Sequence, residues 1–240
     1  MELDASDKPI IYYAHDPMCS WCWGFSPAWK LLKKSILHKY ASKVQVIELL
    51  GGLAPDSDEP MPDSMQKYLQ ETWAEIRQRI PGTEFNFDFW TECQPKRSTW
   101  PACRAVIAAR RQATNDDAFA STQELMTEAI QKAYYTEARN PSDMSTLIEI
   151  ADEIGLDKDQ FATDMQSQAL RVLHQEEMVL VRKLGVQGFP SIVMVIDQVA
   201  HRVLLDYSGL EKTLDHIDRL MKSASIKSDS AVASAAVANG

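Results

Sequence analysis

The hydrophobic pattern at the start of the chain predicts a strand, a helix and a second strand. A short apolar run over residues 10–13 is followed by a turn at Asp16-Pro17. Apolar residues then recur at three- and four-residue steps through a helix that continues over residues 28–37. Residues 44–50 form a second run, rich in branched side chains and ended by Gly51-Gly52. This order is the crossover expected between two parallel strands.

The pattern becomes helical almost throughout residues 61–184. The predicted helices span residues 64–79, 102–113, 117–134, 144–154 and 160 onward. Turn and cap signals such as Pro81-Gly82 and Gly155 separate them. The middle of the chain is therefore expected to be a large block of helices.

Strand periodicity returns after this block. Residues 191–196 predict a strand, Asp197-Gln198 a turn, and residues 199–207 a further strand. An amphipathic helix follows over residues 210–221. Residues 223–240 are mostly Ser, Ala, Val and Asp without periodicity, so we expect a disordered tail there.

Composition narrows the function classes. The 34 acidic and 25 basic residues give a net charge of −9, without the basic stripe that phosphate binding requires, so nucleic acid is not an expected partner. No run approaches the length of a membrane span, so no membrane association is expected. The first residues lack the pattern of a secretory signal, and four cysteines are few for a secreted scaffold. We therefore expect a cytoplasmic protein with catalytic or redox-sensing cysteines.

The main chemical candidate is the pair Cys19 and Cys22, in the segment Cys19-Ser20-Trp21-Cys22. Cys19 is expected in the first helical turn, where unpaired N–H groups and the helix macrodipole favour a thiolate over a thiol. Cys22 lies one turn further on the same face and is predicted to be less exposed. Cys19 would attack a disulfide, and Cys22 would then attack the resulting mixed disulfide.

Other readings of the cysteines fit less well. A zinc site needs a second ligand pair at similar spacing, which Cys93 and Cys103 do not provide, so no metal is expected. A disulfide across such a short loop would restrain little of the unfolded chain. We interpret Cys93 and Cys103 as structural, with Cys103 as a small buried hydrophobe.

The chain resembles the thioredoxin fold in three features. These are the Cys-X-X-Cys after a first strand, Pro27 five residues later, and Gly188-Phe189-Pro190 before a late strand. The helical block makes it similar to the DsbA family within that fold. Three strings resemble the FrnE-like branch of predicted disulfide isomerases, and these are DPMCSWCWGF at 16–25, WPACRA at 100–105 and GVQGFPS at 185–191.

The resemblance implies an α/β thioredoxin fold with a large all-helical insertion between the second and third strands. It places a thioredoxin-like domain at residues 8–58 and 176–222 and an inserted helical domain at 59–175, and the tail expected at 223–240 lies outside the resemblance. It assigns Cys19 as nucleophile and Cys22 as resolving thiol. It also implies that Pro190 follows a cis bond and lies against the disulfide, with Gly188 and the backbone of Phe189 available to a bound peptide.

Thioredoxins carry a buried acid on the first strand, but residues 10–13 contain no carboxylate. Glu48, on the second strand, or water is left to take the proton of the resolving thiol. His15, if protonated, would favour the Cys19 thiolate, and it is otherwise a solvated turn residue.

Aromatic residues crowd the predicted reactive helix. Trp21 is expected to be exposed and to suit unfolded or peptide substrates, whereas Trp23 and Trp29 are expected in the core.

These features predict a thiol–disulfide oxidoreductase or protein-disulfide isomerase that acts on protein or small-molecule thiols and disulfides. Its redox centre is the Cys19-Cys22 pair, with no bound cofactor and with glutathione as a candidate co-substrate. Two alternatives stay open. One is a glutathione-dependent isomerase or transferase similar to the kappa class, and the other is a redox-regulated chaperone or partner-binding protein. Reduction or isomerisation suits a reducing compartment better than net oxidation.

Overall fold

The computed structural model describes residues 8–223, which form two compact units. In the described part of the chain, the first unit contains residues 8–13, 26–48 and 191–223. The second contains residues 14–25 and 49–190. Of the tail predicted over 223–240, residues 224–240 lie outside the described residues, as do residues 1–7, while residue 223 is the last residue of a helix. The domain boundaries stay a prediction.

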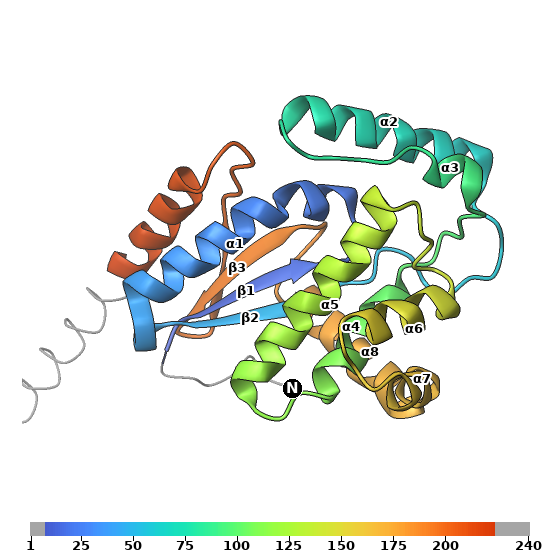
Figure 1. Ribbon diagram of the computed structural model, residues 1–240. Helices are drawn as coiled ribbons and strands as arrows, with labels where there is room; N and C mark the ends of the chain where they lie inside the picture. The colour runs from blue at the N-terminus through green and yellow to red at the C-terminus, as the bar shows by residue number, and fades with distance from the viewer. Residues whose placement is uncertain (1–7, 224–240) are drawn as a thin grey trace, which may run out of the picture. The chain divides into compact units, whose positions relative to one another are not determined.

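A four-stranded sheet organises the first unit, in the order β2-β1-β3-β4 (Figure 1). The strands are β1 (Ile10–His15), β2 (Gln45–Leu50), β3 (Ser191–Ile196) and β4 (Val199–Val203), and the last residues of β1 and β2 belong to the second unit. Every residue of the two central strands β1 and β3 is buried, which explains their unbroken apolar sequences. The edge strands β2 and β4 are partly exposed.

A tight hairpin joins β3 to β4. The two strands pair antiparallel from Ile192 opposite Val203 to Ile196 opposite Val199. Asp197 and Gln198 form the turn with φ values of 50° and 64°, the left-handed conformation of a two-residue type I′ hairpin. The predicted turn is confirmed, while β4 ends four residues before the predicted limit at residue 207.

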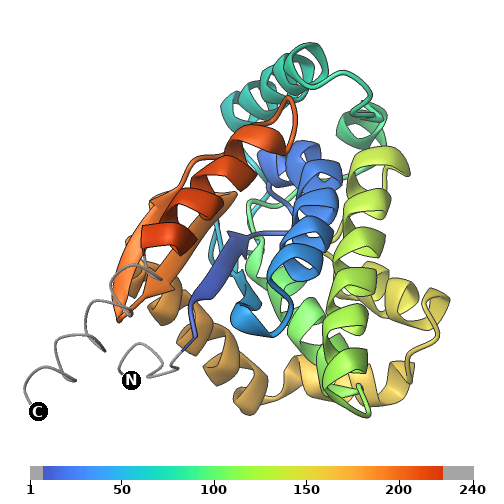
Figure 2. The same cartoon turned by 90° about the vertical axis from the view of Figure 1, so that its left-hand side faces the viewer.

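Helix α1 (Ser20–Tyr40) begins in the second unit and continues into the first, with Pro27 inside it. A short 3₁₀ turn, η1 (Ala41–Lys43), follows. In the first unit, Lys39 and Tyr40 at the end of α1 both contact the Asp218 carboxylate of the helix over residues 211–223, coloured red in Figure 2. Ile217 of that helix is fully buried, as its amphipathic pattern predicts.

The second unit is built from helices. They are α2 (Asp63–Arg79), α3 (Phe89–Glu92), α4 (Trp100–Arg111), α5 (Asp116–Thr136), α6 (Met144–Glu153), α7 (Lys158–Gln166) and α8 (Gln168–Lys183). Helix α4 is central, packing against α5, α6, α7 and α8. Residues 102–109 are all buried, and the four alanines and one cysteine among them allow close packing from several sides. Within residues 8–223, no helix is both long and apolar enough to cross a bilayer.

The element order confirms the predicted helical insertion between the second and third strands. Helices α2, α4, α5 and α6 begin and end within two residues of their predicted limits, but the helix predicted from residue 160 onward is two helices, α7 and α8, separated at Ser167. The pattern missed α3, a single turn of four residues that is too short to show helical periodicity.

Candidate active site

The two cysteines of the Cys-X-X-Cys segment lie at the beginning of α1. Asp16 and Cys19 close a turn after β1, in which the Cys19 N–H donates to the Asp16 carbonyl at 3.0 Å. Cys19 occupies the cap position, because the Trp23 N–H donates to its carbonyl at 3.0 Å. Cys19 Sγ accepts a hydrogen bond from the Cys22 N–H at 3.3 Å. It takes the part that the side-chain oxygen plays in an ordinary N-cap residue. The Cys19 sulfur therefore accepts a backbone N–H at the helix start, the positive end of the helix macrodipole.

The two sulfurs differ in environment. Both cysteines carry free thiols, and Cys19 is 5% exposed whereas Cys22 is 1% exposed. The pKa of Cys22 is raised well above its ordinary value, first by burial and then by its hydrogen bond to Cys19 and the nearby charges of Cys19 and Asp16. The structure therefore agrees with the prediction that Cys22 is the less accessible thiol of the pair.

The segment at residues 188–190 lies beside Cys19. The Phe189-Pro190 peptide bond is cis, which confirms the conformation predicted for Pro190. Cys19 Sγ donates to the Phe189 carbonyl at 3.4 Å. Pro190 is buried and Gly188 is exposed. The Phe189 ring packs directly on Gly51, where any Cβ would overlap it, so this close approach requires glycine.

The predicted site residues Cys19, Trp21, Gly188 and Phe189 line one cavity of about 340 Å³. Pro190 is not part of its lining. The cavity is enclosed by the start of α1, the loop after β2, helix α2 and the segment before α4. The structure thus brings together residues that are far apart in sequence around the Cys19 sulfur.

The exposure predicted for two of the tryptophans is wrong. Trp21 is half-buried rather than exposed, and the Arg79 guanidinium lies 5.9 Å from the centre of its ring. Trp23 is also only partly buried, stacking on Tyr135 while its Nε1 donates to the Glu84 carbonyl at 3.0 Å. Both rings contact residues of the second unit that the sequence pattern does not place beside α1. Trp29 is buried, as predicted.

Sequence reasoning missed Asp16, which is fully buried next to the cysteines. Its Oδ1 accepts from the Met18 N–H at 2.9 Å. Its Oδ2 accepts from the Leu53 N–H at 2.9 Å and from the Thr99 hydroxyl at 2.7 Å. Asp16 therefore ties the turn before the cysteines to two distant loops. Its only sequence signal is the Asp-Pro pair, which indicates a turn.

Burial raises the pKa of Asp16, although hydrogen bonds from Leu53, Thr99, Met18 and the Cys103 thiol oppose the shift. Its backbone N–H also bonds Cys22. The buried carboxyl group therefore keeps its proton more readily than an exposed one.

The remaining cysteines do not pair with each other. Cys103 is fully buried, as predicted, but its thiol bonds the Asp16 carboxylate and so has a polar partner that the sequence did not indicate. Burial and the Asp16 charge raise the pKa of Cys103 well above its ordinary value. Cys93 is half-buried and donates to the Ala138 carbonyl at 3.0 Å.

The two other candidates for assisting the thiols have different surroundings. Glu48, in the first unit, accepts from Trp29 Nε1 at 3.0 Å and from Lys33 Nζ at 2.9 Å. His15 is 2% exposed, so the interpretation of it as a solvated turn residue is wrong. It ends β1, and its carbonyl accepts from the Gly51 N–H at 2.7 Å.

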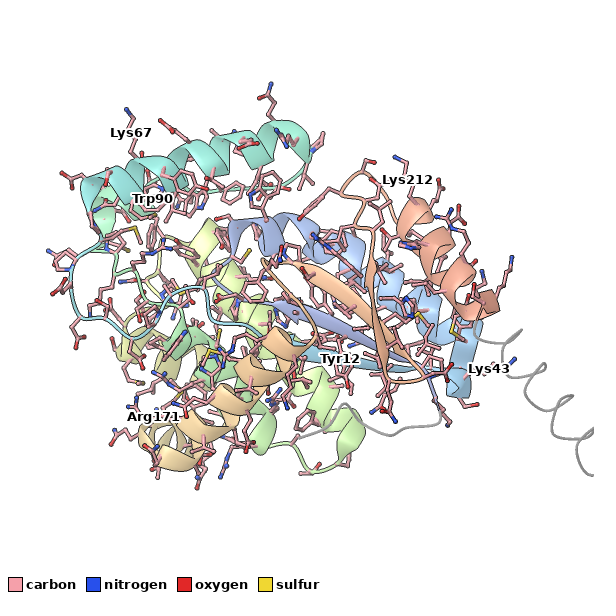
Figure 3. The ribbon with its side chains drawn as sticks, turned by 180° about the vertical axis from the view of Figure 1, so that it is seen from behind. Tyr12, Lys43, Lys67, Trp90, Arg171 and Lys212 are labelled. Atoms are coloured by element: carbon pink, nitrogen blue, oxygen red, sulfur yellow. The ribbon has the colours of Figure 1, made fainter. Side chains whose placement is uncertain are left out.

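An aromatic cluster supports the first turn of α1. Its centre is Trp73, whose Nε1 donates to the Ser20 hydroxyl at 3.0 Å. Trp90, labelled in Figure 3, lies 4.8 Å from the Trp73 ring centre. The other rings around Trp73 are Phe85, Phe87, Phe89, Tyr134 and Tyr135. This rigid packing fixes Ser20, the residue directly after Cys19.

One known protein family matches this chain over most of its length. The model of the DSBA-like thioredoxin domain matches residues 11–218. The chain belongs to this family. Membership in the DSBA-like family confirms the predicted thioredoxin fold with a helical insertion.

Solved structures share the fold of this DSBA-like domain. A candidate protein disulfide isomerase from Nitrosomonas europaea superposes with a TM-score of 0.72, at 23% identity, over 90% of this chain and 98% of that chain. The cytosolic disulfide reductase DsbM from Pseudomonas aeruginosa has a TM-score of 0.66 and 24% identity, over 90% and 100% of the two chains. DsbM has also been solved with GSH.

A relative whose name describes a different role also matches this chain. The ClpXP adapter protein SpxH from Bacillus subtilis (strain 168) is 28% identical over 188 residues, which are 77% of this chain. The match covers 58% of the length of SpxH.

Proposed function

We propose that this protein exchanges thiols and disulfides through Cys19, with Cys22 as the resolving thiol. The observation that carries the proposal is the paired geometry at the start of α1. Cys19 Sγ accepts the Cys22 N–H at 3.3 Å and lies at a cavity beside the cis Phe189-Pro190 bond. Such a pair can capture a substrate sulfur and then release it.

In the reductive direction, the Cys19 thiolate attacks a substrate disulfide. A Cys19–substrate disulfide forms, the substrate S–S bond breaks, and one substrate sulfur leaves as a thiolate that takes a proton from water. Cys22 then loses its proton and attacks Cys19 Sγ. The Cys19–Cys22 disulfide forms, the second substrate thiol leaves, and two electrons have passed from the protein to the substrate.

Asp16 is the base proposed for the Cys22 proton. Cys22 is 1% exposed, so bulk water has little access to its thiol. The Asp16 backbone N–H bonds Cys22, and the carboxylate of the same residue is close enough to raise the Cys22 pKa. In the ionised form this carboxylate accepts the proton as the Cys22 sulfur attacks. In this proposal Asp16, rather than Glu48 or water, accepts the proton of the resolving thiol.

The substrate is proposed to bind along residues 188–190. The Phe189 carbonyl, which now accepts from Cys19 Sγ, offers a backbone acceptor beside the reacting sulfur. Gly188 is exposed and leaves the backbone accessible, while Trp21 forms an apolar wall of the same cavity. Protein and small-molecule disulfides are the proposed substrates.

We further propose that the protein acts in the cytoplasm as a reductase or isomerase, with glutathione as co-substrate. Two molecules of a thiol such as glutathione would reduce the Cys19–Cys22 disulfide and leave as one disulfide, which balances the cycle. The cytosolic description of DsbM and its structure with GSH support this choice of compartment and thiol. A reducing compartment also favours reduction over net oxidation.

The cysteine roles are tested by insulin reduction with a thiol as reductant. We expect Cys19→Ser to abolish turnover and Cys22→Ser to accumulate a covalent substrate adduct, detected by mass spectrometry. Cys93→Ser is the matched control, since that thiol bonds Ala138 and is expected to leave turnover intact. Full activity of Cys19→Ser would contradict the assignment. Tight glutathione binding without dithiol exchange would instead favour the glutathione-dependent isomerase or transferase.

A second candidate function is that of a protease adapter or partner-binding protein, favoured by the similarity to SpxH. This role would use the surface of the helical unit and would not need thiol chemistry. The double variant Cys19→Ser/Cys22→Ser separates the two functions. Delivery of a client protein to ClpXP, or suppression of client aggregation, that survives both substitutions would support the adapter role.

A further inference from the structure

The cavity beside Cys19 has the size of a small-molecule site. Its volume of about 340 Å³ lies within the range of roughly 300–1,000 Å³ that is usual for ligand pockets. Apolar and aromatic side chains form much of its wall, among them Met18, Met61, Tyr68 and Tyr134. An occupant of this size has one end within reach of the Cys19 sulfur.

The charged side chains that line this cavity are both basic, namely Lys96 and Arg97. No acidic side chain is among the described residues of the lining. The protein as a whole carries a net charge of −9, so this local excess of positive charge opposes the overall trend. The chemistry of the cavity therefore favours an anion.

The two cations differ in how far they are already neutralised. Lys96 Nζ lies 3.5 Å from Asp58 and 3.4 Å from Asp143. Arg97 has no carboxylate in ion-pair range within residues 8–223, and its Nη1 donates to the thioether of Met65 at 3.1 Å. Arg97 is therefore the cation whose charge and remaining N–H groups are available to a ligand.

The backbone that carries Arg97 is held in place. On one side, Lys96 forms an antiparallel bridge with Pro60, and the Met61 N–H donates to the Pro95 carbonyl at 2.7 Å. On the other side, the Ser98 carbonyl accepts from the Ser142 hydroxyl at 3.1 Å. Arg97 thus projects from a fixed segment, which reduces the entropy lost on binding.

We propose that the cavity binds low-molecular-weight thiols or disulfides that carry a carboxylate, and that Arg97 binds this carboxylate. The inference rests on the proposed function, because it needs the ligand sulfur at Cys19. In the bound complex, the Cys19 thiolate attacks the ligand disulfide, a mixed disulfide forms, and the other half of the ligand leaves as a thiolate. Arg97 is a specificity residue, since it contacts the ligand far from the reacting sulfur.

The test compares two disulfides of similar size. Dithiodipropionate ends in carboxylates, whereas hydroxyethyl disulfide ends in hydroxyls. The rate at which each oxidises the reduced protein is followed by stopped-flow tryptophan fluorescence, and the quantity compared is the ratio of the two rate constants. We expect Arg97→Gln to lower the ratio of anionic to neutral rate by about three- to fivefold, the effect of a solvent-accessible ion pair. Arg97→Lys should recover part of it.

Lys67→Gln is the matched control, because it also removes one positive charge from the helical unit. Lys67 points outward from α2 (Figure 3) and does not line the cavity. An equal fall of the ratio in Lys67→Gln, or no fall in Arg97→Gln, would overturn the inference. If Arg97→Gln slowed insulin reduction as strongly, the cavity would serve protein substrates, and the small-molecule assignment would be wrong. Failure of both disulfides to oxidise the wild-type Cys19-Cys22 pair would instead refute the proposed function.

Discussion

The substitution Asp16→Asn tests the proposed transfer of the Cys22 proton to Asp16. Asn keeps the size of the side chain but cannot take a proton. Burial and the neighbouring groups raise the pKa of Cys22 well above its ordinary value, so the Cys22 thiol keeps its proton near neutral pH. Release of the substrate from Cys19 therefore depends on a base at Cys22.

Two opposing effects set the size of the change. Loss of a positioned general base costs about 10²- to 10⁴-fold in rate. Loss of the Asp16 charge lowers the Cys22 pKa, because this charge is one of the causes that raise it, and part of the rate is recovered. We expect substrate release to slow by about 10- to 100-fold near pH 7. The deficit should shrink at alkaline pH, where Cys22 ionises without a base.

Release is measured in a single turnover with an aryl disulfide that liberates thionitrobenzoate. The first equivalent appears when Cys19 attacks, and the second appears when Cys22 resolves the mixed disulfide. Asp16→Asn should slow only the second phase, in a pH-dependent way. Asp164→Asn is the matched control, because Asp164 is a buried acid of the same unit that pairs with Arg111 and is remote from the cysteines in sequence. A second phase unchanged by Asp16→Asn, or slowed equally at every pH, would refute the assignment.

Two further predictions concern stability. Thr99→Val should destabilise the protein by about 1–3 kcal/mol in urea unfolding at neutral pH, because the hydroxyl that donates to Asp16 and accepts from the Ala54 N–H is lost, while Thr99→Ser should cost less. Burial and the charge of Arg104 lower the pKa of His174 from 6.5 to about 4, so the unfolded chain takes up a proton that the folded chain does not. Stability should therefore fall by up to about 3 kcal/mol as the pH falls from 6.5 to 4, and equal pH dependence in His174→Gln would contradict this.

The parts of the site that the sequence predicted are those encoded locally. Cys19 and Cys22 are three residues apart. The hydrophobic pattern of the residues on either side predicts the strand, the turn and the helix around them. The cis bond before Pro190 followed from the resemblance of its short motif, and it needed no knowledge of distant contacts. The strands β1 and β3 were found for the same reason, since their apolar runs are continuous.

The parts that were missed depend on contacts between distant segments. The partners of Asp16 include Leu53, 37 residues away, and Thr99, 83 residues away. The half-burial of Trp21 and Trp23 likewise depends on residues of later helices, such as Arg79 and Tyr135. A single sequence gives no record of such pairings, because period and propensity report only on neighbours along the chain.

The raised pKa of Asp16 indicates why this residue is a functional candidate rather than a structural one. Four hydrogen bonds favour its ionised form, yet burial outweighs them and the pKa is still raised. The folded chain therefore holds this proton more tightly than the unfolded chain does, and ionisation weakens folding as the pH rises through the raised pKa. An apolar residue at position 16 would avoid this cost, although the hydrogen-bond donors around it would lose their acceptor. In the proposed function, this buried carboxyl group, which costs stability, is the acceptor of the proton that Cys22 loses.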